Sequence, residues 1–328
     1  MTRGARSYLE SMTTEQAPIH SGFGARSTAQ EVIAGHDLTG SIAIVTGGHG
    51  GIGLETTRAL AGAGATVLVG SRDVARAREA LEGIPRVEID RLDLFAPASV
   101  DAFAARFLAT QRPLHRLIDN AGIMAVPLVR DARGYESQVA TNHFGHFQLT
   151  ARLWPALVRA NGARVVVLTS RGHVRGAFDF DDPFFVARAY DKWNAYGRSK
   201  TANALFALAL DARGAKQGVR AFSVHPGAVM TDLARAVSSE ELAKLRPADW
   251  RSSYKTPAQG AATSVWCATS AQLDEKGGVY CEDVDVSVAV PGDFEGTTGV
   301  RPWARDPAIA ERLWWETERW SGVRFSVG

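Results

Sequence analysis

From residue 41 onwards, short runs of β-branched and other apolar residues alternate with longer segments whose apolar positions recur at helical spacing. This alternation predicts an α/β fold, a single Rossmann-type, doubly wound parallel sheet with helices on both faces. Because the strand runs are apolar throughout, both faces of the sheet should be covered. The predicted strands are residues 42–45, 66–69, 87–89, 114–118, 164–168 and 221–224. The predicted helices are residues 52–63, 74–81, 98–110, 135–159 and 196–213.

The first part of the chain lacks this pattern. Residues 1–36 are rich in Ser, Thr, Gly and Ala and show little periodicity, which predicts an N-terminal arm that is either packed on the domain or partly disordered. Within it, Ser27 and Gln30 have the spacing of a capping box, and Gly35 would end the short helix. Residues 37–328 are then expected to form one domain.

A C-terminal helix is predicted to start at Asp306-Pro307, because proline is tolerated in the first turn. It carries Trp314, Trp315 and Trp320 and should pack back on the domain. The sequence leaves open whether it covers the substrate site, belongs to the core or forms an oligomer contact.

Composition narrows the range of partners. The chain has 328 residues, 45% of them hydrophobic, and a formal net charge of +2, so nothing indicates a nucleic-acid partner. The two cysteines, Cys267 and Cys281, have no metal-ligand spacing, we expect no disulfide between them, and they fit a reducing cytoplasm. The N-terminus lacks the apolar centre of a signal peptide, and the longest apolar run, residues 202–210, is far shorter than the roughly 20 residues that span a bilayer. We therefore expect a soluble, cytoplasmic protein without a membrane span.

A glycine-rich turn directly follows the first predicted strand, with Gly47, Gly51 and Gly53 in a G-x-x-x-G-x-G spacing and a helix after it. In this context glycines let the backbone approach a pyrophosphate at the helix N-terminus. The turn, which also contains His49 and Ile52, therefore predicts a dinucleotide site.

The next strand ends in Ser71-Arg72, where an NAD site would place an acid against the ribose hydroxyls. Arg72 could instead pair with a 2′-phosphate, so we predict that NADP(H) is preferred over NAD(H). The alternative is a solvated arginine at the start of a helix.

Tyr196 and Lys200 are four residues apart and would share one face of a helix. A nearby ammonium would favour the phenolate of a tyrosine, whose pKa is ordinarily about 10, and would fit it for proton transfer. Taken alone, the spacing is more often that of an ordinary surface pair.

Taken together and in this order, the motifs resemble those of the short-chain dehydrogenase/reductase family, over about residues 37–282. The family's T-G-x-x-x-G-x-G motif is met from Thr46 to Gly53, and its N-N-A-G segment reads Asp119-Asn120-Ala121-Gly122, which departs at the first position. The remaining matches are Asp93 after the third strand, Asn142, Ser170, Tyr196 with Lys200, and Pro226-Gly227 with Thr231.

The resemblance implies roles for these residues. Asp93 would contact adenine, residues 226–231 would close over the nicotinamide carboxamide, and Asn142 would hold a water that links Lys200 to solvent. Tyr196 would be the general acid or base, with Ser170 stabilising the charge on the substrate oxygen and Lys200 binding the nicotinamide ribose. Family members commonly form homodimers through the helices that contain Asn142 and Lys200, although the inserted loop could interfere.

The 25 residues between Ser170 and Tyr196 carry six aromatic side chains, and this long gap resembles the retinol-dehydrogenase and protochlorophyllide-reductase-like branch. That branch implies a bulky, apolar carbonyl or alcohol as substrate. The aromatics would either wall an apolar pocket or pin the loop to the domain. Residues 232–254 are the other candidate wall. A rival hypothesis is a protein that binds NADP(H) as a redox sensor without turnover. Neither the substrate nor the direction of the reaction follows from the sequence.

Overall fold

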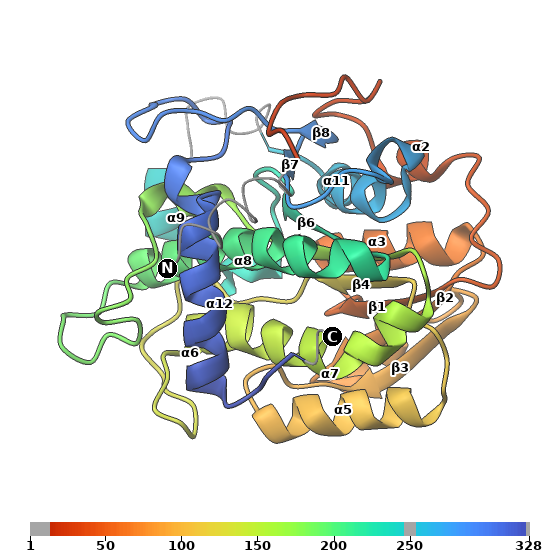
Figure 1. Ribbon diagram of the computed structural model, residues 1–328, viewed down its shortest axis with the longest axis horizontal. Coiled ribbons are helices and arrows are strands. Elements are labelled where there is room, and N and C mark those ends of the chain that lie inside the picture. Colours follow the sequence, from red (N-terminus) through yellow and green to blue (C-terminus); the bar gives the residue numbers. More distant parts are fainter. Residues whose placement is uncertain (1–13, 246–253, 326–328) are drawn as a thin grey trace.

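The computed structural model of the chain describes residues 14–245 and 254–325. Within these residues the central element is an eight-stranded sheet of order β3-β2-β1-β4-β5-β6-β7-β8 (Figure 1). Neighbouring strands pair in parallel except β7 and β8, which are antiparallel. The predicted doubly wound sheet is confirmed. The strands are β1 (Ile42–Thr46), β2 (Thr66–Ser71), β3 (Val87–Arg91), β4 (Arg116–Asp119), β5 (Ala163–Leu168), β6 (Val219–His225), β7 (Tyr280–Glu282) and β8 (Asp285–Val286).

Two hydrophobic cores lie on the two faces of this sheet, because successive residues of a strand point to opposite faces. In β1, Ile44 packs into one core, whereas Ala43 and Val45 pack into the other. The first core is covered by α5 (Pro97–Ala109), α7 (Gly145–Arg159), α8 (Lys192–Gly214) and α12 (Pro307–Ser321), and the second by α2 (Ala29–Ile33), α3 (Gly51–Gly62), α4 (Val74–Ala80) and α11 (Pro257–Thr269).

The helix predicted over residues 135–159 is not continuous. Glu136 caps a short helix, α6 (Ser137–Val139), and a π-helical turn over residues Ala140–Phe144 precedes α7. A π turn inserts an extra residue into the helix, which hydrophobic periodicity does not reveal. The helix that carries Tyr196 begins earlier than predicted, at Lys192, with the Asp191 carboxylate accepting from Asn194 N.

The arm packs on the domain through its described residues. The Gln16 amide donates to the carbonyls of Tyr280 and Ser287 at 2.8 and 2.7 Å, and the Asp285 carboxylate accepts from Ile19 N at 2.9 Å. The predicted capping box lies one residue further along: Thr28, not Ser27, caps α2, and Glu31, not Gln30, completes the box. Residues 1–13 lie outside the described part of the chain.

The predicted C-terminal helix is confirmed as α12, with the Asp306 carboxylate accepting from Ala308 N and Ile309 N. It lies across α8, as Figure 1 shows. Trp314, 2% exposed, packs against Phe147 of α7 and Phe206 of α8, whereas Trp315 on the opposite side is 58% exposed. Packing therefore buries one face of the helix in the core.

The hairpin β7–β8 and helix α11 were not predicted. The two strands are three and two residues long, too short for a recognisable alternation. In α11, nine consecutive residues from Gly260 to Ala268 are buried, so this helix has no polar stripe to show its period.

Among the described residues, no helix has the length and apolar content required to cross a membrane. Cys267 and Cys281 are both buried and free, in line with the expectation that they form no disulfide.

Candidate active site

Most of the predicted site residues lie in turns that follow β1 to β6, at the carboxyl edge of the sheet, whereas Asn142, Tyr196 and Lys200 lie on helices. In the strand order, β1 and β4 are neighbours at the position where the winding of the sheet reverses direction. Open α/β sheets bind ligands in the crevice at such a switch point. The sheet therefore gathers residues from distant parts of the sequence around one crevice.

The glycine turn fits a pyrophosphate. Gly50 precedes α3 and no side chain caps this helix, so its first N–H groups stay available to an anion. A Cβ on Gly53 would lie 2.5 Å from both Asn120 Nδ2 and Gly47 O, and Gly51 has a positive φ of 51°. Side chains at these positions would fill the cradle, so the residues present suit a dinucleotide.

Thr46 joins the glycine turn to the segment after β4. Its hydroxyl accepts from Asn120 N and Ala121 N, each at 2.9 Å, and Asn120 Nδ2 donates to Thr46 O at 2.8 Å. His146 of α7 joins the same hydroxyl at 2.9 Å and lies 3.0 Å from Asn142 O. No pattern in the sequence indicates this contact.

The departure at Asp119 has a physical explanation. Its side chain is fully buried, its Oδ2 accepts from Thr150 Oγ1 at 3.3 Å, and burial raises its pKa well above the ordinary range. A neutral carboxylic acid matches an asparagine amide in size and can donate one hydrogen bond. Burial thus favours the neutral form of Asp119, in which its side chain resembles the first asparagine of the motif.

The adenosine end of the crevice is basic. Arg72 is exposed, and Arg76 of α4 forms an ion pair of 2.7 Å with Asp232. Burial lowers the pKa of His49, and the positive charges of Arg76 and Arg72 act in the same direction, whereas the Asp73 carboxylate opposes them. Ser71, in contrast, is 2% exposed, and its hydroxyl donates to Asp73 O at 2.8 Å. This bond stabilises the turn that contains Ser71. Asp93 Oδ1 accepts from Phe95 N.

Ser170, Tyr196 and Lys200 meet above β5. The Ser170 hydroxyl hydrogen-bonds the Tyr196 phenol and also accepts from Gly172 N at 3.0 Å. Lys200 Nζ lies 5.8 Å from the centre of the tyrosine ring and donates to Leu168 O at 3.0 Å. The structure thus brings together the serine, the phenol and the ammonium, although Ser170 and Lys200 are 30 residues apart in the sequence.

The pKa of Tyr196 differs from the expectation. Burial raises it to about 12, although the hydrogen bond with Ser170 opposes this shift, and burial lowers the pKa of Lys200 to about 8. The expected lowering of the tyrosine pKa by Lys200 is not found, because the cost of burying a phenolate dominates and only the Ser170 hydroxyl opposes it. At neutral pH the phenol is protonated and Lys200 is mostly charged.

Asn142 lies within the π turn before α7. Its Oδ1 accepts from Ile123 N at 2.9 Å, and its Nδ2 donates to Ile123 O and to Ser199 Oγ, each at 3.0 Å. A Cβ on Gly122 would lie 3.1 Å from Asn142 Oδ1 and 3.7 Å from Lys200 Nζ. Asn142 is thus close to the other predicted catalytic residues, and its polar atoms are occupied by the main chain and by Ser199.

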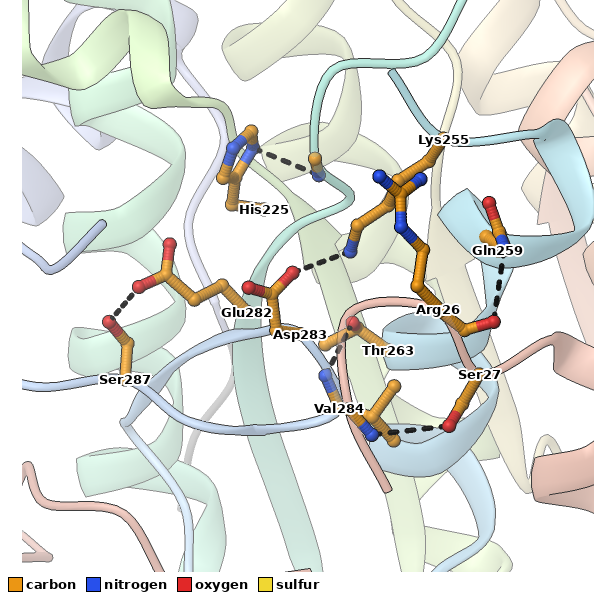
Figure 2. A network of polar contacts seen from close by, with 12 residues as sticks. Arg26, Ser27, His225, Lys255, Gln259, Thr263, Glu282, Asp283, Val284 and Ser287 are labelled. Carbon is orange, nitrogen blue, oxygen red and sulfur yellow. Dashed lines mark hydrogen bonds and ion pairs between the residues drawn. The ribbon is translucent and has the colours of Figure 1, made fainter. Parts of the chain in front are cut away.

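The segment 226–231 bends toward the glycine turn. A Cβ on Gly51 would lie 2.9 Å from Thr231 Cγ2, so these two predicted cofactor contacts face each other. Lys255 packs over Gly227, which has a φ of +88°, and donates to Asp283 Oδ1 at 2.5 Å. Figure 2 shows this ion pair beside His225, the residue before Pro226. The part of the predicted second wall at residues 246–253 lies outside the described residues.

The aromatic side chains of residues 171–195 mainly pin the loop to the domain. Phe178 and Phe185 are 4% and 5% exposed, and Phe184 stacks on Tyr135 with ring centres 4.0 Å apart. Arg130 donates to the carbonyls of Phe184 and Phe185 at 2.8 and 2.7 Å. The aromatic side chains were expected either to wall a pocket or to pin the loop to the domain. The buried Phe178 and Phe185 pin the loop.

A groove of about 670 Å³ lies between the start of this loop and α12. Phe180, Ile309 and Trp315 contribute its apolar lining, and Arg312 lies over the Phe180 ring at 4.0 Å. None of the four predicted catalytic residues belongs to the described lining. The groove is therefore separate from the crevice above β5.

Comparisons with known proteins point to one family of oxidoreductases. Residues 41–242 match the family described as short chain dehydrogenase. A "Probable oxidoreductase" of Streptomyces lividans is 43% identical over 290 residues, covering 85% of this chain and 96% of that protein. Retinol dehydrogenase 12 of Mus musculus is 37% identical over 290 residues, with 84% and 85% of the two chains covered.

Solved structures show the same fold. An uncharacterised protein from Mycobacterium paratuberculosis superposes with a TM-score of 0.71 at 30% identity, over 92% of this chain and 99% of that one. The RhlG/NADP active-site complex of Pseudomonas aeruginosa superposes with a TM-score of 0.61 at 23% identity, over 76% and 96% of the two chains, a likeness that concerns the fold alone.

Proposed function

The chain belongs to the short-chain dehydrogenase/reductase family of oxidoreductases. We propose that it is an NADP(H)-dependent enzyme that interconverts a carbonyl and an alcohol on hydrophobic small molecules, including aromatic ones. The observation that carries the proposal is the buried Tyr196 phenol, with the Ser170 hydroxyl bonded to it and Lys200 one helical turn away.

We propose that the dinucleotide is held along the crevice from the glycine turn to Lys200. Gly47, His49, Gly51, Ile52 and Gly53 would surround the pyrophosphate, because the N-terminus of α3 favours an anion. Ser71, Arg72 and Asp93 would contact the adenosine end. The nicotinamide end would be held by Asn120, Ala121, Gly122, Tyr196, Lys200, Pro226, Gly227 and Thr231. When bound, the nicotinamide supplies or accepts the hydride.

Arg72 is the basis for the NADP preference. It is exposed at the end of β2 and lies near His49 and Arg76, so a 2′-phosphate there would meet a cluster of donors. The carboxylate that would favour a free 2′-hydroxyl is replaced by Ser71, whose own hydroxyl is engaged with Asp73.

The proton chemistry follows from the states of the side chains. With a pKa raised to about 12, the Tyr196 phenol carries a proton at neutral pH and can donate it to the oxygen of a carbonyl undergoing reduction. Ser170 donates a hydrogen bond to the same oxygen, where negative charge develops. Lys200 stabilises the tyrosinate that remains, because its ammonium is one turn away, and in the oxidative direction that tyrosinate is the base.

Asn142 completes this group by position. Its contacts with Ile123 fix the segment after β4 beside Lys200, and a water bound here would link Lys200 to solvent. The substrate would enter above Ser170, between the residues 123–130 and the loop 171–195, where Leu128, Val129 and Val186 are 39%, 52% and 75% exposed. These exposed apolar side chains favour an apolar substrate.

A panel of carbonyl compounds with NADPH, followed by the loss of absorbance of the reduced coenzyme, tests the proposal. We expect turnover with bulky apolar ketones or aldehydes and little with sugars. Tight binding of NADPH without turnover across the panel would favour the redox-sensor hypothesis instead. That rival gives no reason for the buried Ser170–Tyr196 contact, since a sensor needs no proton donor.

The oligomeric state stays a prediction. A homodimer through the helices that contain Asn142 and Lys200 would have to form beside α12, because this helix already packs on α7 and α8.

A further inference from the structure

A buried histidine, His173, has no role in the site described above. It lies in the turn that starts at Ser170 and ends at Arg175, here called the serine turn. It belongs to the 3₁₀ turn Arg171–Arg175, which Ser170 caps, and its side chain is fully buried. The turn packs against the phenol, since a Cβ on Gly172 would lie 2.9 Å from Tyr196 Cε1. A shift of this turn would therefore move the Ser170 hydroxyl relative to Tyr196.

Two main-chain partners fix the tautomer of His173. Its Nδ1 lies 2.9 Å from Ser170 O, which can only accept, and its Nε2 lies 3.2 Å from Arg301 N, which can only donate. The ring must therefore be neutral, with its proton on Nδ1. Burial lowers its pKa to about 4, although the bond to Ser170 O opposes this, so the neutral form persists at physiological pH.

The far side of His173 is bound to the C-terminal part of the chain. Trp303 Nε1 donates to His173 O at 2.8 Å, and the Tyr280 ring packs on the imidazole with centres 5.1 Å apart. Arg301 in turn holds the loop before it, donating to Phe294 O at 2.5 Å. The histidine thus joins the serine turn to a segment more than 120 residues away in the sequence.

We propose that His173 is a positioning residue, which donates from Nδ1 to Ser170 O and so holds the Ser170 hydroxyl against the Tyr196 phenol. This inference rests on the proposed function. It adds a determinant of turnover that does not touch substrate or coenzyme.

Two substitutions separate positioning from mere filling of space. In His173→Asn the amide nitrogen falls close to the place of Nδ1 and can still donate to Ser170 O, but the acceptor for Arg301 N is lost. In His173→Gln the side-chain amide reaches the place of Nε2, so that acceptor is kept. The side-chain donor to Ser170 O is lost, which leaves the main-chain bond from His173 N, at 3.1 Å, to hold this carbonyl. His115→Gln is the matched control, because His115 Nδ1 also accepts a main-chain N–H, from Ile42 at 3.0 Å, at the opposite edge of the sheet.

With a carbonyl that the wild type reduces, we expect His173→Gln to lower kcat on the order of 100-fold, because small misplacements of catalytic groups have effects of this size. The KM for NADPH should stay within about two-fold, and His173→Asn should keep kcat within roughly a factor of five. His115→Gln should leave kcat unchanged. Equal losses in the Asn and Gln variants, or no loss in His173→Gln, would overturn the proposal.

A second readout does not need turnover. In protein labelled with ¹³C at tyrosine Cζ, the Tyr196 resonance is assigned by its absence in Tyr196→Phe. We expect His173→Gln to shift this resonance, because the hydrogen bond from Ser170 is displaced, and His173→Asn and His115→Gln to leave it in place. If the resonance does not move in His173→Gln, the positioning role of His173 is refuted, whether or not a carbonyl is reduced. If no carbonyl is reduced but the resonance moves, only the proposed function is refuted.

Discussion

The glycine turn after β1 and the serine turn after β5 lie at the same edge of the sheet but are held in opposite ways. The glycine turn depends on side chains that are absent, because a Cβ on Gly53 would meet Asn120 and Gly47 at 2.5 Å. The serine turn depends on side chains that are present and buried, above all His173, which bonds to Ser170 and to Arg301. The geometry of the glycine turn follows from its own glycines, whereas the serine turn also has contacts with the C-terminal part of the chain.

The difference teaches how each turn can fail. A glycine turn fails when an atom is added, and the failure should affect coenzyme binding. The serine turn fails when a hydrogen bond is removed, and the failure should affect turnover. Coenzyme affinity and turnover, measured on the same variants, separate these two outcomes.

Tyr196→Phe tests the chemistry beside the serine turn. The ring packing is kept while the proton donor is removed, so we expect turnover to fall on the order of 1,000-fold, with the dissociation constant of NADPH nearly unchanged. Steady-state kinetics and a fluorescence titration of the coenzyme measure the two quantities. Tyr135→Phe is the control, because its hydroxyl donates to Trp320 O, outside the site. Normal turnover in Tyr196→Phe would rule out the assigned role.

Gly53→Ala tests the glycine turn. The added methyl group would press on Asn120 Nδ2 and Gly47 O, an overpacking that typically costs about 1–3 kcal/mol. We expect NADPH to bind roughly 10- to 100-fold more weakly, since each 1.4 kcal/mol is a factor of ten. Gly62→Ala is the matched control in the same helix, because nothing lies within 4 Å of its Cβ. If both variants bind NADPH as the wild type does, the turn is not the cradle.

Arg72→Leu tests the specificity at the adenosine end. A charge-assisted bond to a 2′-phosphate at an exposed site should contribute about 1–2 kcal/mol, so we expect NADPH to bind roughly 10-fold more weakly while NADH is little affected. Calorimetric titration with both coenzymes measures this. Arg78→Leu, in the exposed part of α4, is the control. Equal affinity of the wild type for the two coenzymes would contradict the NADP preference.

The pH dependence of reduction should show the smallest effect. The ammonium of Lys200 is lost as the pH rises through about 8, whereas the Tyr196 phenol keeps its proton, so kcat should fall to about half its pH 7 value at pH 8. Since the pKa of this lysine is 10.5 in the unfolded chain, the unfolded state binds more protons between about pH 8 and 10.5, and the contribution of Lys200 to the free energy of unfolding rises across that window. A rate that falls while stability holds therefore indicates titration at the site. A plateau to pH 10 would exclude it.

The sequence predicted the sheet and the glycine turn because both are encoded locally. Apolar runs specify the strands, and Gly47, Gly51 and Gly53 lie within one turn, so their spacing alone predicts the cradle. The family resemblance added Asn142, Ser170 and the Tyr196–Lys200 pair, which the fold places around one point. That they meet could not be derived from spacing, because their contacts join β5, α8 and the π turn.

The remaining features depend on burial and on distant partners. The raised pKa values of Tyr196 and Asp119 follow from how completely the fold encloses these side chains, which no local pattern reveals. His173 gives no local signal either, since its partners Tyr280 and Arg301 are 107 and 128 residues away. For the same reason the short hairpin β7–β8 that carries Tyr280 was not predicted.

The position of α12 has a consequence for how the protein is made. This helix is the last described element of the chain, yet Trp314 and Phe325 fill space between Phe147 of α7 and Phe206 of α8. During synthesis, the aromatic surface of α7 and α8 stays uncovered until residues 307–325 have been made, and it is open to self-association or chaperones in that interval. Removal of these residues would leave all eight strands of the sheet but would expose this aromatic face.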